Sequence, residues 1–158
     1  MRNFMNPNTP GLLLLVEDNA DDEELTLMAF EQGGITNPVV VARDGVEALD
    51  YLFATGVYCD RSPDQLPALI LLDLQLPRIN GLEVLQRIKS NRKTQLIPVV
   101  ILTTSNEQQD LVESYSLGCN SYIQKPVDYD QFLQVIQQLG MYWLVINSSP
   151  PLLAAYDE

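Results

Sequence analysis

Residues 69–85 read LILLDLQLPRINGLEVL, and the rest of the chain is best understood outward from them. Leu69–Leu72 is a short apolar run of the kind that a strand covered on both faces requires. Asp73 ends this run, Asn80–Gly81 supplies a turn, and apolar residues then recur at helical spacing from Leu82. The stretch therefore predicts a buried strand, a polar residue at its carboxyl end and an amphipathic helix.

The same strand and helix unit repeats along the chain. Short apolar runs bounded by turn residues predict five strands, at residues 12–16, 39–42, 68–72, 98–102 and 121–123. Stretches with apolar residues at helical spacing follow these runs. The repetition predicts a doubly wound α/β fold, in which a five-stranded parallel sheet carries helices on both faces.

Length and composition are those of a soluble globular protein. The 158 residues suffice for one domain, which we expect at residues 11–146, including an extended C-terminal helix, between a flexible segment at 1–10 and a tail at 147–158. The apolar runs are too short to cross a bilayer, and the first residues lack a secretory core. We therefore expect a cytoplasmic protein without a membrane partner.

The charges and the missing histidine exclude several functions. The formal net charge of -12 repels phosphate backbones, so nucleic-acid binding is not expected. The chain has no histidine, which rules out Ser-His-Asp and Cys-His catalysis, histidine metal sites and a phosphohistidine of its own. Cys59 and Cys119 lack the spacing of a zinc or redox motif, and we interpret them as structural or incidental.

Residues at the predicted strand ends form the candidate site, because sites in doubly wound sheets lie beyond the carboxyl ends of the strands. These residues are Glu17, Asp18, Asp73, Thr103, Thr104 and Lys125. Carboxylates gathered at one edge would repel by about 4 kcal/mol per close pair at an effective dielectric of 20. A protonated carboxyl, the Lys125 ammonium or a magnesium ion could offset that repulsion. The alternative interpretation of Glu17 and Asp18 is that this segment only begins the next helix, with Asp18 or Asn19 as its cap.

Four segments stand in a characteristic order: LLLLVEDN at 12–19, LILLDLQLPRINGLEVL at 69–85, PVVILTTS at 98–105 and YIQKP at 122–126. Together they resemble the receiver domains of bacterial response regulators, the CheY-like family, from Leu12 to Leu139. The resemblance implies a flavodoxin-like (βα)5 fold that accepts a phosphoryl group from a sensor histidine kinase. It implies a signalling switch that catalyses only its own phosphorylation and dephosphorylation, and not an enzyme.

The resemblance implies a role for each residue of the acidic edge. Asp73 is the phosphoacceptor, a nucleophile toward the phosphorus of the kinase phosphohistidine. Asp18, Asp73 and the main-chain carbonyl of Gln75 would bind Mg²⁺, while Glu17 acts through metal-bound water. Lys125 would pair with a phosphoryl oxygen.

The resemblance also implies a conformational switch. Thr103 matches the switch hydroxyl and Tyr122 the aromatic switch residue, whose ring turns inward as the hydroxyl moves, although both could be ordinary strand residues. Gln75 and Ser105, each two positions beyond a site residue, would tune dephosphorylation. Neither is an evident general base, so hydrolysis should be slow. Lys125–Pro126 matches a pair whose peptide bond is often cis in the family.

Two other interpretations compete with the receiver switch. An aspartate-nucleophile phosphatase also places a carboxylate at a strand end beside magnesium, but its general acid, two positions on, would be Gln75 here. The other is a receiver-like module that binds partners constitutively and is never phosphorylated. The intact set of strand-end residues argues against it.

The C-terminal region points to a pathway and to an assembly. The segment ARDGVEALDYL at 42–52 and the tail from Gly140 look similar to small single-domain regulators paired with cyanobacterial phytochrome kinases. Apolar residues continue past Leu139, and we expect a homodimer interface at Tyr142, Trp143 and Ile146. Trp143 could instead complete the core of a monomer.

Overall fold

A computed structural model of the chain describes residues 11–150. The strands are β1 (Leu13–Val16), β2 (Val39–Ala42), β3 (Leu69–Leu72), β4 (Val99–Thr103) and β5 (Ser121–Gln124). The helices are α1 (Ala20–Gln32), α2 (Gly45–Phe53), α3 (Gly81–Ser90), α4 (Gln108–Leu117) and α5 (Tyr129–Gly140), with a 3-10 turn η1 (Gly56–Tyr58) and a π-helical segment η2 (Met141–Ile146). The predicted flexible segment 1–10 and residues 151–158 of the predicted tail lie outside the described residues.

The strands form the predicted parallel sheet, in the order β2-β1-β3-β4-β5. The chain moves outward from β1 to β2 and then returns past β1 to β3, so the order reverses between β1 and β3. Val16 pairs with Leu72 at the carboxyl end of this junction, and Asp73 N–H donates to Val16 O at 3.1 Å. The residues that follow these two strands therefore lie beside each other at the point where ligands bind in open α/β sheets.

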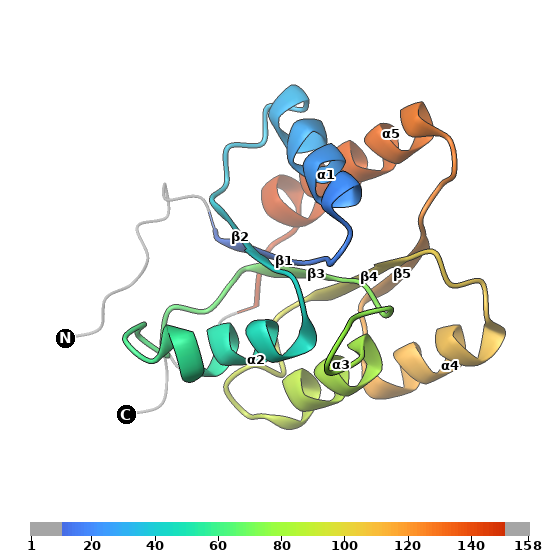
Figure 1. The fold of residues 1–158 in the computed structure, drawn as a ribbon. Coiled ribbons are helices and arrows are strands. Elements are labelled where there is room, and N and C mark those ends of the chain that lie inside the picture. Colours follow the sequence, from blue (N-terminus) through green and yellow to red (C-terminus); the bar gives the residue numbers. More distant parts are fainter. Residues whose placement is uncertain (1–10, 151–158) are drawn as a thin grey trace.

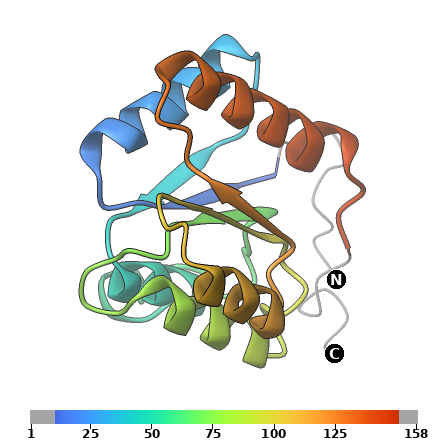
Figure 2. The ribbon, with the colours of Figure 1, turned by 90° about the vertical axis from the view of Figure 1, so that its right-hand side faces the viewer.

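Helical layers cover both faces of the sheet, which confirms the doubly wound fold. Helices α1 and α5 lie on one face, and α2, α3 and α4 lie on the other (Figures 1 and 2). Because successive strand residues point to opposite faces, Leu14 and Val16 belong to one core while Leu13 and Leu15 belong to the other. No residue of β1 or β3 is more than 2% exposed. These two strands are thus rigid supports for whatever follows them.

Short polar side chains begin four of the helices. Asn19, Asp44, Asn80 and Asp128 each accept a hydrogen bond from a backbone N–H three residues further on. Asn19, and not Asp18, therefore caps α1. The Asp18 carboxylate is left available at the edge of the sheet.

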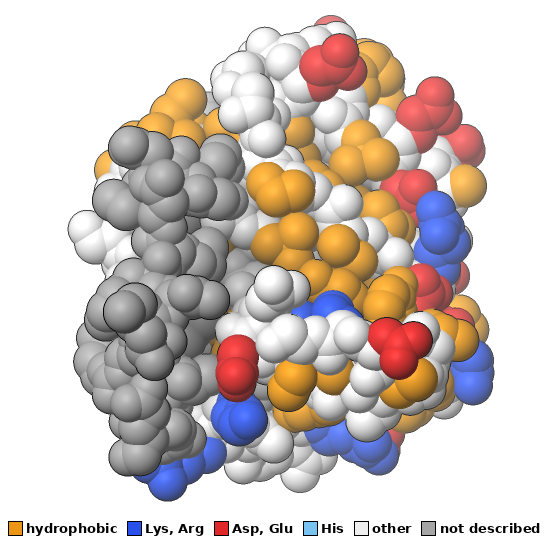
Figure 3. Space-filling view, turned by 90° about the vertical axis from the view of Figure 1, so that its left-hand side faces the viewer, with side chains coloured by type: hydrophobic (Ala, Val, Ile, Leu, Met, Phe, Trp, Pro, Cys, Tyr) orange, Lys and Arg blue, Asp and Glu red, His pale blue; other side chains and the backbone are white. Residues whose placement is uncertain are grey.

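Strand β2 forms one edge of the sheet. Figure 3 shows the side of the molecule that lies to the left in Figure 1, and hydrophobic side chains gather across the middle of this view. Val39, Val40 and Val41 of β2 are half-buried. An edge strand of only four residues offers little backbone for pairing with another chain.

Helix α5 continues directly into η2. Trp143 and Leu144 of η2 are half-buried and pack against the core beneath α1 and α5. Even with this extension, none of the helices within residues 11–150 has the length and hydropathy needed to span a membrane.

Candidate functional site

The candidate site lies at the carboxyl ends of β1, β3 and β5. Glu17 and Asp18 follow β1, Asp73 follows β3, and Lys125 follows β5. Glu17, Asp73 and Lys125 are 2%, 5% and 7% exposed, whereas Asp18 is exposed. The structure thus brings together the acidic and basic residues that the sequence placed at one edge.

The backbone after Asp73 is held in close contact with α3. Gly81 N–H donates to Leu74 O at 2.9 Å, and a Cβ on Gly81 would lie 2.3 Å from Asp73 O. Only glycine fits at this position. The Asn80–Gly81 turn therefore fixes the loop that carries the acceptor carboxylate.

The Lys125 ammonium is the centre of the site. Its Nζ donates hydrogen bonds to Glu17 Oε1 at 2.6 Å, to Asp22 Oδ2 at 2.8 Å and to Asp73 Oδ2 at 2.9 Å. The Lys125–Pro126 peptide bond is trans, so the lysine reaches these groups without the cis bond that is common in the family it resembles. These charge-assisted contacts hold the ammonium in one position.

Asp22 is the member of this cluster that the sequence analysis missed. It lies in the first turn of α1, which begins directly after the Glu17–Asn19 segment. The first turn of a helix that follows β1 at once must lie at the same edge as the strand ends, and this was the available signal. The apolar spacing used to predict α1 carries no information about its polar side chains.

Burial and the shared ammonium change the protonation of the site. Burial raises the pKa of Glu17 from 4.5 to about 7, and the hydrogen bond from Lys125 opposes this only in part. Burial alone would lower the pKa of Lys125, but the hydrogen bonds to Asp22 and Glu17 outweigh it and the pKa is raised. The Lys125 ammonium therefore stays charged. Because three carboxylates share it, it offsets only part of the cost of burying a charged Glu17.

The acidic edge fits a divalent cation. Glu17, Asp18 and Asp73 can offer ligand oxygens that lie within 4.8 Å of one another. With Asp22, the edge carries four carboxylates against one ammonium, an excess of negative charge that a bound cation would reduce. The backbone N–H of Gln75 donates to Asp73 Oδ1 at 3.0 Å, while a metal contact from the Gln75 carbonyl stays a prediction.

The two predicted switch residues meet at the loop after β4. Thr103 is fully buried, and its Oγ1 accepts a hydrogen bond from Ser105 N–H at 3.3 Å. The half-buried Tyr122 packs against the core, and its hydroxyl donates to Ser105 O at 3.2 Å. Ser105 therefore touches both residues through its backbone.

The two residues predicted to tune dephosphorylation are each held by another side chain. Thr104 Oγ1 donates to Gln75 Oε1 at 2.7 Å, and Ser105 Oγ donates to Asp110 Oδ2 at 2.6 Å. Thr104 was expected at the candidate site without a specific role, and Asp110 was not expected there. The spacing of residues along the sequence could not have predicted either contact, because each depends on the direction in which two side chains point.

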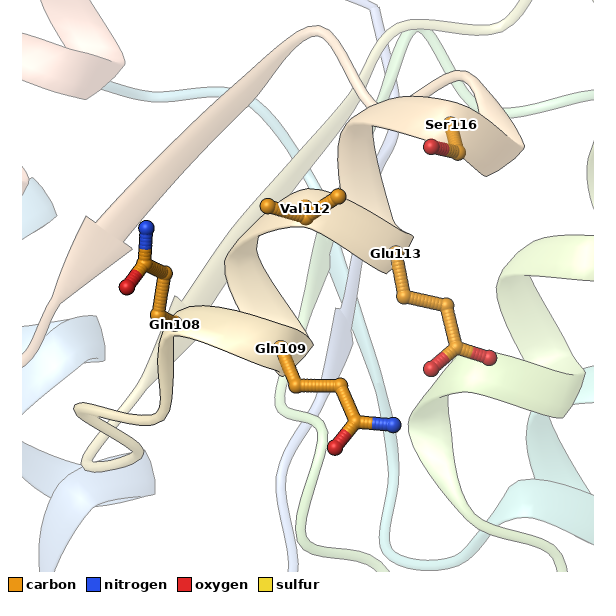
Figure 4. Close-up of a pocket in the computed structure, with 5 residues that line it drawn as sticks. All are labelled: Gln108, Gln109, Val112, Glu113 and Ser116. Carbon is orange, nitrogen blue, oxygen red and sulfur yellow. The ribbon is translucent and has the colours of Figure 1, made fainter.

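A shallow surface hollow of about 510 Å³ lies apart from the acidic cluster of Glu17, Asp18 and Asp73. Its lining side chains all project from α4, as Figure 4 shows: Gln108, Gln109, Val112, Glu113 and Ser116. None of them belongs to the acidic cluster. Its chemistry gives no reason to place a ligand there.

The three residues predicted to form a dimer interface differ in how exposed they are. Tyr142 and Ile146 are 50% and 65% exposed, and the neighbouring Val145 is 60% exposed. Trp143 is half-buried against the core and makes an edge-to-face contact with Tyr142 at 5.1 Å. Trp143 thus contributes to the monomer core, while its neighbours form an exposed apolar strip.

Comparison with known proteins identifies a family. The profile described as "Response regulator receiver domain" matches residues 13–137. Response regulator Rcp1 of Synechocystis sp. is 39% identical over 143 residues, which cover 90% of this chain and 95% of Rcp1. The crystal structure of its Mn(2+)-bound form superposes with a TM-score of 0.84 and 36% identity, covering 90% of this chain and 100% of that one.

Two further solved structures are similar over most of their length. The phosphorylated cyanobacterial phytochrome response regulator RcpA has a TM-score of 0.84 and 39% identity, with 90% of this chain and 99% of that chain covered. The bacteriophytochrome response regulator AtBRR has a TM-score of 0.69 and 54% identity, with 88% and 99% covered.

Proposed function

This chain belongs to the response regulator receiver domain family, and we propose that Asp73 accepts a phosphoryl group from a sensor histidine kinase. The observation that carries the proposal is the buried contact of 2.9 Å between Lys125 Nζ and Asp73 Oδ2 beside the other carboxylates of the edge. A carboxylate that is oriented by one cation and lies next to a second cation site has the surroundings that a phosphoryl acceptor needs.

The contacts of Asp73 prepare it for in-line attack. A carboxylate oxygen of Asp73 forms the new P–O bond while the P–N bond to the kinase histidine breaks and the histidine nitrogen keeps the electron pair. Lys125 and the Gln75 N–H each hold one oxygen of the carboxylate, so its orientation is fixed before the donor arrives. Glu17, Asp18 and Asp73 would hold Mg²⁺, which when bound supplies positive charge to the phosphoryl oxygens.

Phosphorylation would be transmitted through the loop after β4. The Thr103 hydroxyl accepts from Ser105 N–H, so its own proton is available for a phosphoryl oxygen. Movement of Thr103 toward Asp73 would draw Ser105 with it and change the hydrogen bond between Ser105 O and Tyr122. We infer that these residues are the switch, and that the chain signals without being an enzyme for other substrates.

The kinase partner is proposed to be a bacterial phytochrome. The support is similarity to RcpA, a cyanobacterial phytochrome response regulator, and to AtBRR, a bacteriophytochrome response regulator. We place this role in the cytoplasm, a reducing compartment that suits a chain with only two cysteines, Cys59 and Cys119.

We also propose that the chain forms a homodimer through η2. Met141, Tyr142, Val145 and Ile146 are 40% to 65% exposed and adjoin the packed Trp143. A two-fold contact would let this apolar strip cover its own copy. Because Trp143 is already held by the monomer, its neighbours would supply most of the contact area.

Phosphoryl labelling tests the central proposal. Acetyl phosphate with Mg²⁺ should add one phosphoryl group to the wild type, and Asp73→Asn should accept none. Intact-mass spectrometry and peptide mapping report the site, and an excess of chelator should suppress labelling. Equal labelling of Asp73→Asn would refute the assignment, and release of phosphate from many unrelated phosphomonoesters would favour the phosphatase instead.

A further inference from the structure

Lys125 uses its whole hydrogen-bonding capacity inside the site. An ammonium has three N–H donors, and the Nζ of Lys125 lies 2.6 Å, 2.8 Å and 2.9 Å from three carboxylate oxygens. These belong to Glu17 after β1, Asp22 in α1 and Asp73 after β3. The lysine is therefore held from three directions by three separate segments.

Asp22 is itself fixed in place. Its backbone N–H donates to the Asn19 side chain at 3.0 Å, and its carbonyl accepts from the buried Thr26 hydroxyl at 2.7 Å. Its side chain is 24% exposed, compared with 3% for Glu17 and 6% for Asp73. Asp22 thus holds Lys125 from the solvent side, on a helix turn that cannot easily shift.

We propose that Asp22 is a positioning residue for phosphoryl transfer, which holds the Lys125 ammonium so that one N–H stays directed at Asp73. The inference rests on the proposed function of Asp73. Glu17 and Asp22 together occupy two of the three N–H groups, and the third is left for the acceptor carboxylate and for the phosphoryl group that becomes bonded to it. Without Asp22, the long lysine side chain regains rotamers that point into solvent.

The charge of Asp22 matters less than the contact it makes. Asparagine keeps a carbonyl oxygen that can accept from Lys125, whereas alanine leaves that N–H to water. Asp22→Asn should therefore retain most of the positioning effect. Asp21, an exposed neighbour on the same helix turn, is a matched control for the loss of one negative charge.

The test measures phosphorylation kinetics with acetyl phosphate for the wild type and for Asp22→Ala, Asp22→Asn and Asp21→Ala. Asp22→Ala should lower the maximal rate constant about tenfold, the size expected for one hydrogen bond to a charged group. The donor concentration at half-maximal rate should not rise, and Mg²⁺ affinity measured by calorimetry should stay within about twofold of the wild type, because Asp22 is not among the proposed ligands. Asp22→Asn should fall between Asp22→Ala and the wild type.

The outcomes separate this inference from the function on which it rests. If the wild type and Asp21→Ala are labelled but Asp22→Ala reacts at the same rate, the positioning role is wrong and the phosphoacceptor assignment stands. A parallel loss of Mg²⁺ affinity in Asp22→Ala would also overturn it, because Asp22 would then act through the cation site. If the wild type is not labelled, the proposed function fails and this inference fails with it.

Discussion

Replacing Glu17 by glutamine should change how the stability of the protein depends on pH when no divalent cation is bound. The pKa of Glu17 is raised from 4.5 to about 7 because burial disfavours its charged form. Between these two values the folded chain binds a proton that the unfolded chain has lost. The contribution of Glu17 to stability therefore falls as pH rises through this window, the reverse of the usual behaviour of a paired carboxylate.

The size of the effect follows from the same shift. At 1.36 kcal/mol per pKa unit, ionising Glu17 in the folded state costs about 3 kcal/mol, and its side chain is only 3% exposed, so solvent screens little of this. The remaining ionisable groups are common to both proteins, so the comparison isolates the Glu17 carboxyl. The free energy of unfolding of Glu17→Gln, relative to that of the wild type, should thus be about 3 kcal/mol higher at pH 8 than at pH 4.5.

Urea denaturation in the presence of chelator, at pH values from 4.5 to 8.5, measures this difference. Glu24→Gln removes one exposed charge from α1 and should shift stability by less than about 0.5 kcal/mol at every pH. Adding Mg²⁺ at pH 8 should stabilise the wild type more than Glu17→Gln, because the ionised carboxylate is the better ligand. A constant difference between Glu17→Gln and the wild type across the pH range would refute the reasoning.

Two other changes test the remaining parts of the site and the assembly. Thr104→Val should shorten the half-life of the phosphorylated protein about threefold, since the Gln75 amide loses one neutral hydrogen bond and its oxygen becomes free to accept from an attacking water. Radiolabel decay measures it, and an equal effect in a Gln75→Ala background would contradict this mechanism. Ile146→Asp should convert a dimer to a monomer in analytical ultracentrifugation, whereas Val57→Asp, at a position 84% exposed in η1, should not. A dimer that survives Ile146→Asp would move the interface away from η2.

Most of the fold could be predicted because its signals are local. Each apolar run predicted a strand to within one or two residues, and the cap residue Asn80 lies where a turn was expected. The register of parallel strands then places their ends at one edge, so Glu17, Asp73 and Lys125 could be brought together without coordinates.

The contacts that were missed depend on side-chain directions between segments distant along the chain. Asp22 and Lys125 are 103 positions apart, and Thr104 and Gln75 are 29 apart. Periodicity fixes which face of an element is apolar, but it does not say which polar groups meet. The same limit applies to η2, where the apolar stripe predicted a longer helix but not the π-helical turns or the packing of Trp143.

The hydrogen bonds around Ser105 explain how a small event at Asp73 could become a change of surface. Ser105 is joined to Thr103 through its N–H, to Tyr122 through its carbonyl and to Asp110 through its hydroxyl. The neutral contacts to Thr103 and Tyr122 contribute about 1 kcal/mol each and the contact to the Asp110 carboxylate about 2 kcal/mol, so no single one locks the loop. A phosphoryl oxygen that attracts the Thr103 proton therefore needs to supply only a few kcal/mol of differential interaction to favour another arrangement of all of them. Because Asp110 lies on α4 and Tyr122 on β5, that rearrangement would reach the surface next to both elements.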